Sequence, residues 1–296
     1  MAKNLKEDLN EDPSFRKRVR NIVWEDPSIS ARLFPYLKDE KALIIPKMVY
    51  SCVDMETDDR FPVPPQELWA GTWASSAEYL ASGKDHSNAM MNILGASGFR
   101  FGEKHRILDF GCGAGRIIRC FKPLKEGREI WGVDISTKHI LWCHQNLCPP
   151  FKFITTTTFP HLPFEDNYFD IIYAGSVFTH ISELAGAWLL ELRRILRPEG
   201  RCYITVRDNH SIEMILSSPP GHRLHDTPIR QQLIDFDKEK HFLESGFSMI
   251  VLSRDPGNAE VFYDIDFLRQ TWGNFFEILS INHEAFGSQT AITLSK

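Results

Sequence analysis

The segment between residues 105 and 206 alternates short β-type runs with helix-period runs, and this alternation restricts the possible folds more than any other feature. Runs rich in β-branched and aromatic residues predict strands at 105–110, 129–134, 151–158, 169–176 and 201–206. Strands that are separated by helices lie parallel to one another in a single sheet. The sequence therefore predicts an α/β fold built around a parallel sheet.

Helix-period runs occupy the intervals between these strands. Residues 116–124 predict a helix directly after the first strand, and residues 136–147 predict a second. A third helix begins near Ser182 and ends at Pro198, and its apolar stripe consists of Leu184, Trp188, Leu192, Ile195 and Leu196.

The last part of the chain has a different pattern. Residues 263–272 predict a helix, and residues 276–281 and 291–295 predict two strands. The short polar connection between these strands, which contains Gly287, predicts an antiparallel hairpin at the edge of the sheet.

Two segments lie outside the repeating pattern. Residues 1–100 predict a helical N-terminal extension, and residues 101–296 form the core, interrupted by an insertion at about 207–262. Within the insertion, residues 247–263 predict a hairpin that turns around residues 255–258. Because α/β sheets bind ligands at the carboxyl ends of their strands, we expect the insertion to overhang the site as a lid. Within the extension, Trp69 and Trp73 have the spacing of one helix face, which indicates packing against the core or, alternatively, a second lid.

A glycine-rich loop follows the first strand. Gly111, Gly113 and Gly115 permit close approach of a ligand to the backbone, and the amino end of the following helix offers free N–H groups. A dinucleotide-binding loop would place its third glycine at position 116, which is an arginine. Asp109 precedes the first glycine by two residues and suits an ammonium group better than a pyrophosphate.

A second acid closes the second strand. Asp134 lies 23 residues after Gly111, where a carboxylate can accept hydrogen bonds from both hydroxyls of a ribose. The alternative role for Asp134 is that of a helix N-cap. Together, the loop and this acid predict an adenosine ligand that carries an amino acid.

These motifs resemble those of the class I S-adenosylmethionine-dependent methyltransferases. DFGCGAG (109–115) matches their E/D-x-G-x-G-x-G motif, and Asp134 matches their ribose-binding acid. LPFEDNYFDIIYAGSVFTHI (162–181) and LRRILRPEGRCYITV (192–206) are similar to their fourth- and fifth-strand segments. The resemblance implies a Rossmann-like, doubly wound, mostly parallel seven-stranded sheet with an antiparallel C-terminal hairpin, and S-adenosyl-L-methionine as the cofactor.

The resemblance also implies roles for individual residues. The glycine loop surrounds the methionine moiety, Asp134 holds the ribose and Ile135 flanks the adenine. Many family members have an acid after the third strand, whereas this chain has Thr158 followed by Phe159. The implied cofactor-binding residues are Asp109, Gly111, Cys112, Gly113, Gly115, Asp134, Ile135, Thr158, Phe159, Gly175 and Ser176.

The sequence offers one candidate for proton transfer. His180 follows the fourth strand, near the expected methyl group, and histidine can accept a proton near neutral pH. The alternative is a histidine that only hydrogen-bonds a loop or the sheet edge. We expect no metal, because residues 176–181 lack the acids of metal-dependent relatives, and Cys143, His144 and Cys148 fit one face of a helix better than a metal site.

Composition excludes several classes of partner. A net charge of −5 disfavours binding to a nucleic acid backbone. No run reaches the roughly 18 apolar residues of a membrane span, and the first residues lack a signal-peptide core, so we expect a cytoplasmic protein with no membrane partner. The six cysteines contain no C-x-x-C pair and are expected to be reduced.

The sequence-based hypothesis is methyl transfer from S-adenosylmethionine to an O, N or S nucleophile of a small or medium-sized acceptor, such as a saccharide or secondary metabolite. One alternative is a non-catalytic cofactor-binding or assembly protein that keeps the fold. Another is a dehydrogenase, against which Arg116 argues. The identity of the acceptor and the oligomeric state stay open.

Overall fold

The computed structural model describes residues 61–71, 73–102, 105–121, 129–234, 249–252 and 260–296. The predicted N-terminal extension is therefore described only from residue 61 onwards. The hairpin turn expected around residues 255–258 lies outside the described residues.

The described strands are β1 (Arg106–Phe110), β2 (Glu129–Asp134), β3 (Lys152–Thr155), β4 (Phe169–Ala174), β5 (Leu196–Asp208), β6 (Met249–Val251), β7 (Val261–Tyr263), β8 (Glu277–Phe286) and β9 (Gln289–Ser295). The α-helices are α4 (Ser76–Ala96), α5 (Thr137–Asn146), α6 (Ala185–Ile195), α7 (Asn209–Ser217), α8 (Pro228–Ile234) and α10 (Ile265–Trp272). Three short 3-10 helices are η3 (Gln66–Leu68), η4 (Ile118–Cys120) and η5 (Phe178–His180). Among the described helices, none is long and apolar enough to span a bilayer.

The predicted sheet is confirmed, and the structure adds two strands to it. Strands β3, β2, β1, β4 and β5 run parallel in that order, and β9 pairs antiparallel with both β5 and β8. These are the seven expected strands. The insertion contributes a β6–β7 hairpin whose second strand pairs with the end of β5, so the described sheet has nine strands.

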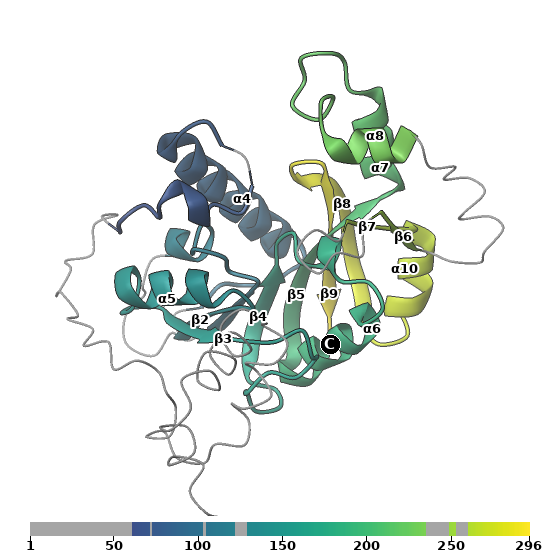
Figure 1. Ribbon diagram of the computed structural model, residues 1–296. Coiled ribbons are helices and arrows are strands. Elements are labelled where there is room, and N and C mark those ends of the chain that lie inside the picture. The colour runs from purple at the N-terminus through teal and green to yellow at the C-terminus, as the bar shows by residue number, and fades with distance from the viewer. Residues whose placement is uncertain (1–60, 72, 103–104, 122–128, 235–248, 253–259) are drawn as a thin grey trace, which may run out of the picture.

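Helices cover both faces of the sheet (Figure 1). Alternate strand residues point to opposite faces. One face packs against α4 and α5 and buries Ile107, Ile171, Tyr173, Met90, Leu94 and Ile140. The other face packs against α6 and α10 and buries Leu108, Ile172, Ile204, Trp188, Leu192 and Leu268.

The prediction of a helix through Trp69 and Trp73 is wrong. Helix α4 begins at Ser76, because Ser75 accepts a hydrogen bond from the Glu78 N–H at 3.2 Å. The Glu78 carboxylate reaches back to the N–H of Ala74 at 2.8 Å. This reciprocal capping fixes the start of the helix after the two tryptophans.

The helix predicted directly after the glycine loop is also corrected. The described residues there form turns and the short η4, which ends at Cys120, and residues 122–128 are outside the described part. Two consecutive β-branched residues, Ile117 and Ile118, followed by Pro123 in the sequence, favour little more than one turn. As far as Phe121, where the described residues stop, the loop therefore gains no free N–H groups from a long helix.

Other boundaries differ by a few residues. Helix α6 begins at Ala185 and ends at Ile195, so Leu184 precedes it and is 42% exposed, not part of the buried stripe. Strand β5 begins directly afterwards and includes Pro198. In the C-terminal hairpin, the strands continue almost to the turn, because the only residues between them are Gly287 and Ser288.

Candidate functional site

The glycine loop leaves β1 in a conformation that suits glycine. Gly111, Gly113 and Gly115 have φ angles of 84°, 51° and 78°. A Cβ on Gly111 would lie 2.2 Å from Val177, and one on Gly115 would lie 2.3 Å from Leu147. At Gly113 the nearest atom would be the Ala70 Cβ, at 4.0 Å. The first and third glycines are thus required by packing, whereas a Cβ on Gly113 would meet no described atom closer than 4.0 Å, so Gly113 faces open space among the described residues.

Asp134, at the end of β2, forms a hydrogen bond with the glycine loop that follows β1. Strands β1 and β2 pair in register, so the loop and Asp134 emerge at the same edge of the sheet. The Asp134 carboxylate accepts the N–H of Gly113 and the N–H of Ser136, both at 2.8 Å. Ser136, not Asp134, caps α5 by accepting the N–H of His139. A carboxylate has about four lone-pair positions, so two stay available for hydroxyl donors.

Two buried thiols orient the middle of the loop. Cys112 and Cys143 donate to the carbonyl oxygen of Gly113, at 3.5 and 3.4 Å. Cys112 is only 6% exposed, and burial raises the pKa of its thiol well above the ordinary value. The Cys112 side chain therefore supports the loop from the buried side, and its backbone is part of the loop.

Asp109 lies beneath the loop and is 3% exposed. Burial raises the pKa of Asp109 from 3.8 to about 7, and the nearby charge of Asp134 acts in the same direction. Its partner across the β1–β4 pairing is Tyr173, whose hydroxyl pKa is raised by burial and by Asp109. A nearby cation would favour the ionised form of this carboxylate.

Exposed apolar side chains follow the ends of β2 and β3. Ile135 is 40% exposed directly after β2, and Phe159 is 46% exposed in the loop after β3. The ends of these strands are adjacent, because Thr156 donates its N–H to the Asp134 carbonyl oxygen at 2.8 Å. Thr158 is exposed, and its carbonyl oxygen accepts from the Trp188 indole at 3.3 Å.

The turn after β4 adopts an unusual conformation. Ser176 has a φ of 60°, in the left-handed region that non-glycine residues rarely occupy. Its N–H donates to Thr205 Oγ1 at 2.7 Å, and its Oγ accepts from Gln289 Nε2 at 2.8 Å. A Cβ on the preceding Gly175 would lie 2.9 Å from the Phe286 ring, so that position also needs glycine.

His180 ends η5, just beyond this turn. Its side chain is exposed, and its N–H donates to the Val177 carbonyl oxygen at 2.9 Å. The neighbouring Thr179 is buried and its hydroxyl is 3.2 Å from Ser176 Oγ. His180 therefore lies near the edge where β4 ends, as the sequence predicted, and its role in proton transfer stays a prediction.

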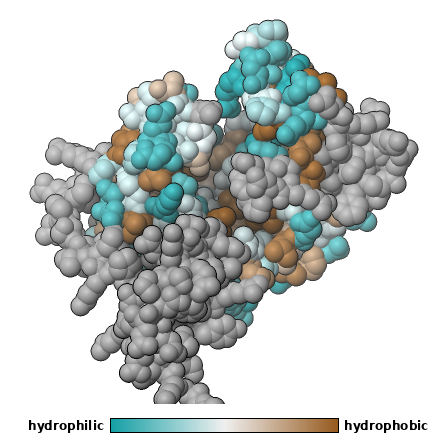
Figure 2. Space-filling view, in the orientation of Figure 1, coloured by the Kyte–Doolittle hydropathy of each residue, from teal (hydrophilic) through white to brown (hydrophobic). Residues whose placement is uncertain are grey.

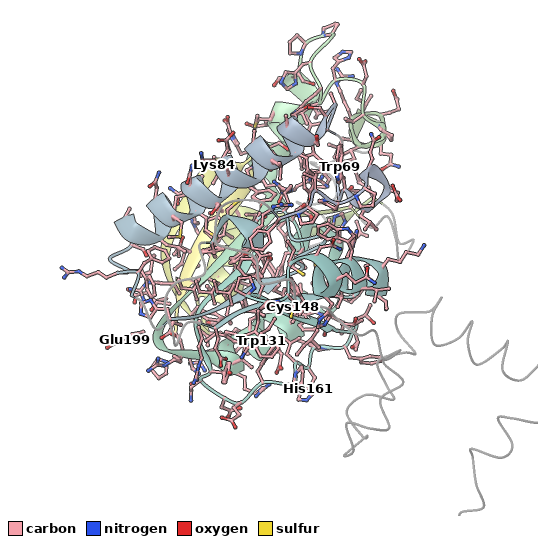
Figure 3. The ribbon with its side chains drawn as sticks, turned by 90° about the vertical axis from the view of Figure 1, so that its left-hand side faces the viewer. Trp69, Lys84, Trp131, Cys148, His161 and Glu199 are labelled. Carbon is pink, nitrogen blue, oxygen red and sulfur yellow. The ribbon has the colours of Figure 1, made fainter. Side chains whose placement is uncertain are left out.

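Residues of the N-terminal extension contact Arg116, which directly follows the glycine loop. Trp69 stacks on Tyr79 with ring centroids 5.1 Å apart, and Trp73 meets the same ring edge-on at 5.2 Å. Figure 3 shows Trp69 beside the start of α4, far from Glu199. Arg116 reaches from the loop to α4, where it contacts His86 Nδ1 at 2.9 Å.

Arg116 and His86 form part of a wall that includes the C-terminal hairpin. The Arg116 guanidinium lies between Trp73 and Phe286, and the His86 ring stacks on Phe286 at 3.8 Å. Burial, together with Arg116 and Arg223, lowers the pKa of His86 to about 4. His86 is therefore neutral near pH 7 and accepts a hydrogen bond from Arg116. The sequence showed that position 116 is an arginine where a dinucleotide-binding loop has glycine. It did not show which residues Arg116 contacts, because His86 and Phe286 are far from it along the chain.

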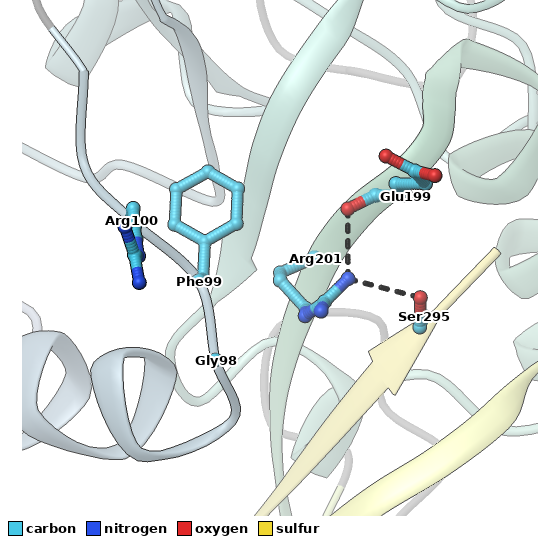
Figure 4. A pocket seen from close by; sticks show the side chains of 6 residues that line it. All are labelled: Gly98, Phe99, Arg100, Glu199, Arg201 and Ser295. Atoms are coloured by element: carbon cyan, nitrogen blue, oxygen red, sulfur yellow. Dashed lines mark hydrogen bonds between the residues drawn. The ribbon is translucent and has the colours of Figure 1, made fainter.

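The surface is hollowed above this edge of the sheet. Figure 2 shows the hollow between α4 and the α7–α8 part of the insertion, with hydrophobic residues visible inside it. A separate pocket of about 520 Å³ lies toward the other edge, and its lining residues are Gly98, Phe99, Arg100, Glu199, Arg201 and Ser295 (Figure 4). None of the predicted site residues lines that pocket, so we do not assign the cofactor to it.

The geometry fits the nucleoside and amino acid parts of S-adenosylmethionine. Open space above Gly113 lets a ligand approach the backbone, and Asp134 has free lone pairs for two hydroxyls. Ile135 and Phe159 offer apolar surface for a flat ring. In the described part of the chain, no group of three or more His, Cys, Asp or Glu side chains is arranged to hold a metal ion.

Comparison with known proteins agrees with this geometry. Residues 108–204, from β1 to β5, match the methyltransferase domain family. The chain is 34% identical over 109 residues to a sterol 24-C-methyltransferase of Schizosaccharomyces pombe, covering 34% of this chain and 28% of that protein. It is 30% identical over 105 residues to the ubiquinone/menaquinone biosynthesis C-methyltransferase UbiE of Paraburkholderia phymatum, covering 34% and 42%. The matched segment spans less than half the length of either relative.

A solved structure with a related arrangement is an S-adenosylmethionine-dependent methyltransferase from Methanosarcina mazei. It has a TM-score of 0.47 and 17% identity, and the alignment covers 66% of this chain and 94% of that one. The family match falls on the segment that carries the glycine loop, Asp134 and the turn after β4. Residues 108–204 of this chain thus match a methyltransferase domain, and the match indicates S-adenosylmethionine as the cofactor of this segment.

Proposed function

We propose that this chain transfers a methyl group from S-adenosylmethionine to an O, N or S nucleophile of a small or medium-sized acceptor. The observation that supports this most directly is the joint placement of the glycine loop and Asp134. The Asp134 carboxylate holds the loop through the N–H of Gly113, at the point where the loop faces open space. A dinucleotide-binding loop would have a third glycine where this chain has Arg116.

Individual residues would have distinct tasks in this reaction. Asp134 would bind the ribose hydroxyls, Ile135 and Phe159 would flank the adenine, and Gly113 would lie against the methionine moiety. When bound, the cofactor supplies a sulfonium that is a strong methyl donor. The chain then has to align the acceptor with that methyl group and exclude water. The wall that contains Arg116, His86 and Phe286 suits the second task.

Proton transfer is needed only for acceptors that lose a proton. We assign this step to His180, because it follows the turn that carries Ser176. Replacement of His180 by alanine tests the assignment: turnover at saturating acceptor should fall if His180 is the base. Unchanged turnover would exclude it from the mechanism.

The curated relatives add a further kind of acceptor atom to the proposal. Two of them are named as C-methyltransferases, one of sterols and one of ubiquinone and menaquinone biosynthesis. Carbon therefore joins oxygen, nitrogen and sulfur as an acceptor atom to be tested. Acceptor choice would depend on the α7–α8 insertion and on the N-terminal extension, which border the hollow (Figure 2).

The decisive experiment uses ligand-induced thermal stabilisation. Purified protein is mixed separately with S-adenosylmethionine, S-adenosylhomocysteine and NAD, and its Tm is measured. A ligand that binds the native state must raise the Tm. We expect both adenosyl compounds to raise it and NAD to leave it unchanged. Stabilisation by NAD alone would overturn the proposal.

A further inference from the structure

Three side chains close a ring of hydrogen bonds at the end of β4. Ser176 donates its N–H to Thr205 Oγ1 at 2.7 Å, and Thr205 Oγ1 donates to Gln289 Oε1 at 2.7 Å. Gln289 Nε2 then donates to Ser176 Oγ at 2.8 Å. Thr205 is fully buried and Gln289 is 6% exposed. The ring thus joins β4, β5 and β9 through residues up to 113 positions apart.

The ring acts on a residue whose backbone is strained. A φ of 60° costs a non-glycine residue about 1–2 kcal/mol. Such conformations persist only where the surroundings over-determine them, and they occur most often at functional sites. At Ser176 the backbone N–H and the side-chain hydroxyl are both fixed by buried partners.

The same hairpin also restrains the residue before Ser176. A Cβ on Gly175 would lie only 2.9 Å from the Phe286 ring, so this ring leaves room for glycine alone. Phe286 and Gln289 stand on either side of the hairpin turn, so the turn contacts two successive residues of the segment after β4. Neither contact could be inferred from a local sequence motif.

We propose that Gln289 is a positioning residue for the methyl-transfer site. It acts through Ser176, by holding the turn after β4 in the conformation that faces the sulfur end of the cofactor. This inference rests on the proposed function, because Ser176 is placed beside the cofactor only by that proposal.

The chain offers a matched control in the next residue. Thr290 is also fully buried on β9, and its Oγ1 makes a hydrogen bond of 2.9 Å with His283 Nδ1. Successive strand residues point to opposite faces, so Thr290 does not contact the β4 turn. Gln289→Met and Thr290→Val each remove buried hydrogen bonding from one strand at similar side-chain volume.

The test measures the Kd for S-adenosylhomocysteine by calorimetry and the Tm of the free protein. We expect both variants to lower the Tm, and only Gln289→Met to raise the Kd, by about tenfold, the equivalent of one net hydrogen bond. Thr290→Val should stay within twofold of the wild type. An unchanged Kd in Gln289→Met would show that Gln289 only stabilises the fold.

A double-variant cycle tests whether Gln289 acts through Ser176. Ser176→Ala should also raise the Kd about tenfold, and the double variant should be no weaker than either single variant. Multiplying effects would overturn the proposal. If Gln289→Met lacks a cooperative thermal transition, Thr205→Val breaks the same ring without a change of shape and replaces it in the cycle. Failure of the wild type to bind S-adenosylhomocysteine would instead refute the proposed function.

Discussion

The two edges of the parallel sheet are built differently. At the edge where the strands begin, acids are paired: Asp170 accepts from Arg197 at 2.7 Å and from the Arg106 N–H at 2.8 Å. Glu129 likewise accepts from Tyr168 and from Lys152.

At the edge where the strands end, the buried acids are less well paired. The glycine loop and Ser176 have positive φ angles, and Asp109 has a pKa near 7 because it is buried. Asp208 is 1% exposed, and its Oδ2 makes no hydrogen bond within the described part of the chain. Positive φ angles occur at both edges, since Asn167 and Glu199 at the first edge have φ angles of 57° and 63°. The two edges therefore differ in how their acids are paired, and the glycine loop and Asp134 lie at the second edge.

The largest effect expected from this contrast comes from Asp134→Ala. It removes the acceptor for the Gly113 and Ser136 N–H groups and the proposed ribose contact, so cofactor binding should be lost in calorimetry. The matched control is Asp170→Ala at the opposite edge, which should lower stability by about 2 kcal/mol and leave the Kd unchanged. Wild-type affinity in Asp134→Ala would refute the assigned site.

A second pair of variants separates packing from binding within one loop. Gly111→Ala forces a Cβ to within 2.2 Å of Val177, at a φ of 84°, and should cost about 3 kcal/mol of stability. Gly113→Ala meets open space and should cost only about 1 kcal/mol in thermal unfolding. Its Cβ would project into the cofactor space, so its Kd should rise by about tenfold or more. Equal stability losses in the two variants would contradict the open space at Gly113.

A third prediction uses the pH dependence of binding. Below its pKa of about 7, Asp109 is mostly protonated and offers no charge to an ammonium group. The Kd for S-adenosylhomocysteine should therefore rise as the pH falls from 8 to 6, by up to about tenfold for each unit below 7. In Asp109→Asn the Kd should be weak and independent of pH. A flat profile in the wild type would show that Asp109 does not face the cofactor charge.

The raised pKa of Asp109 also predicts how the stability of the ligand-free protein depends on pH. Its pKa is about 7 when folded and near 3.8 when unfolded. Between these values the folded chain binds more protons than the unfolded chain, so this group makes stability fall as pH rises. Above pH 7 the full cost of burying the charge is present. Asp109→Asn should therefore reduce the loss of stability, measured by denaturant unfolding, between pH 4 and 7.

The sequence predicted the parallel core and the cofactor motifs because both depend on local patterns. Strand β2 has the predicted bounds, since its apolar run is closed by Asp134. The predicted helix after the glycine loop was wrong, because glycine spacing identifies the loop and does not determine the structure of the next residues. The helix through Trp69 was wrong because the Ser75 and Glu78 capping pair outweighs aromatic spacing.

The partners of the site could not be read from sequence. Arg116 was noted only as the absence of a glycine, but its contacts lie on α4 and β8. Gln289 and Thr205 belong to no motif. Thr205 reaches Ser176 because β5 pairs with β4, and Gln289 reaches it because β9 pairs antiparallel with β5. Such contacts depend on strand order, which local periodicity does not specify.

The smallest predicted effect lies at the paired edge. Hydrogen bonds from Tyr168, Trp131 and Lys152 lower the pKa of Glu129 from 4.5 to about 2. A lowered carboxylate pKa stabilises the fold above pH 4.5, and this contribution is lost progressively as the pH falls toward 2. Because the side chain is partly exposed, solvent screens the effect, and Glu129→Gln should lower the Tm by only a degree or two at pH 7. The difference from the wild type should shrink between pH 5 and pH 2, while the Kd for S-adenosylhomocysteine at pH 7 stays unchanged. A change in that Kd would show that the two edges are coupled, and the division between a stabilising edge and a binding edge would then fail.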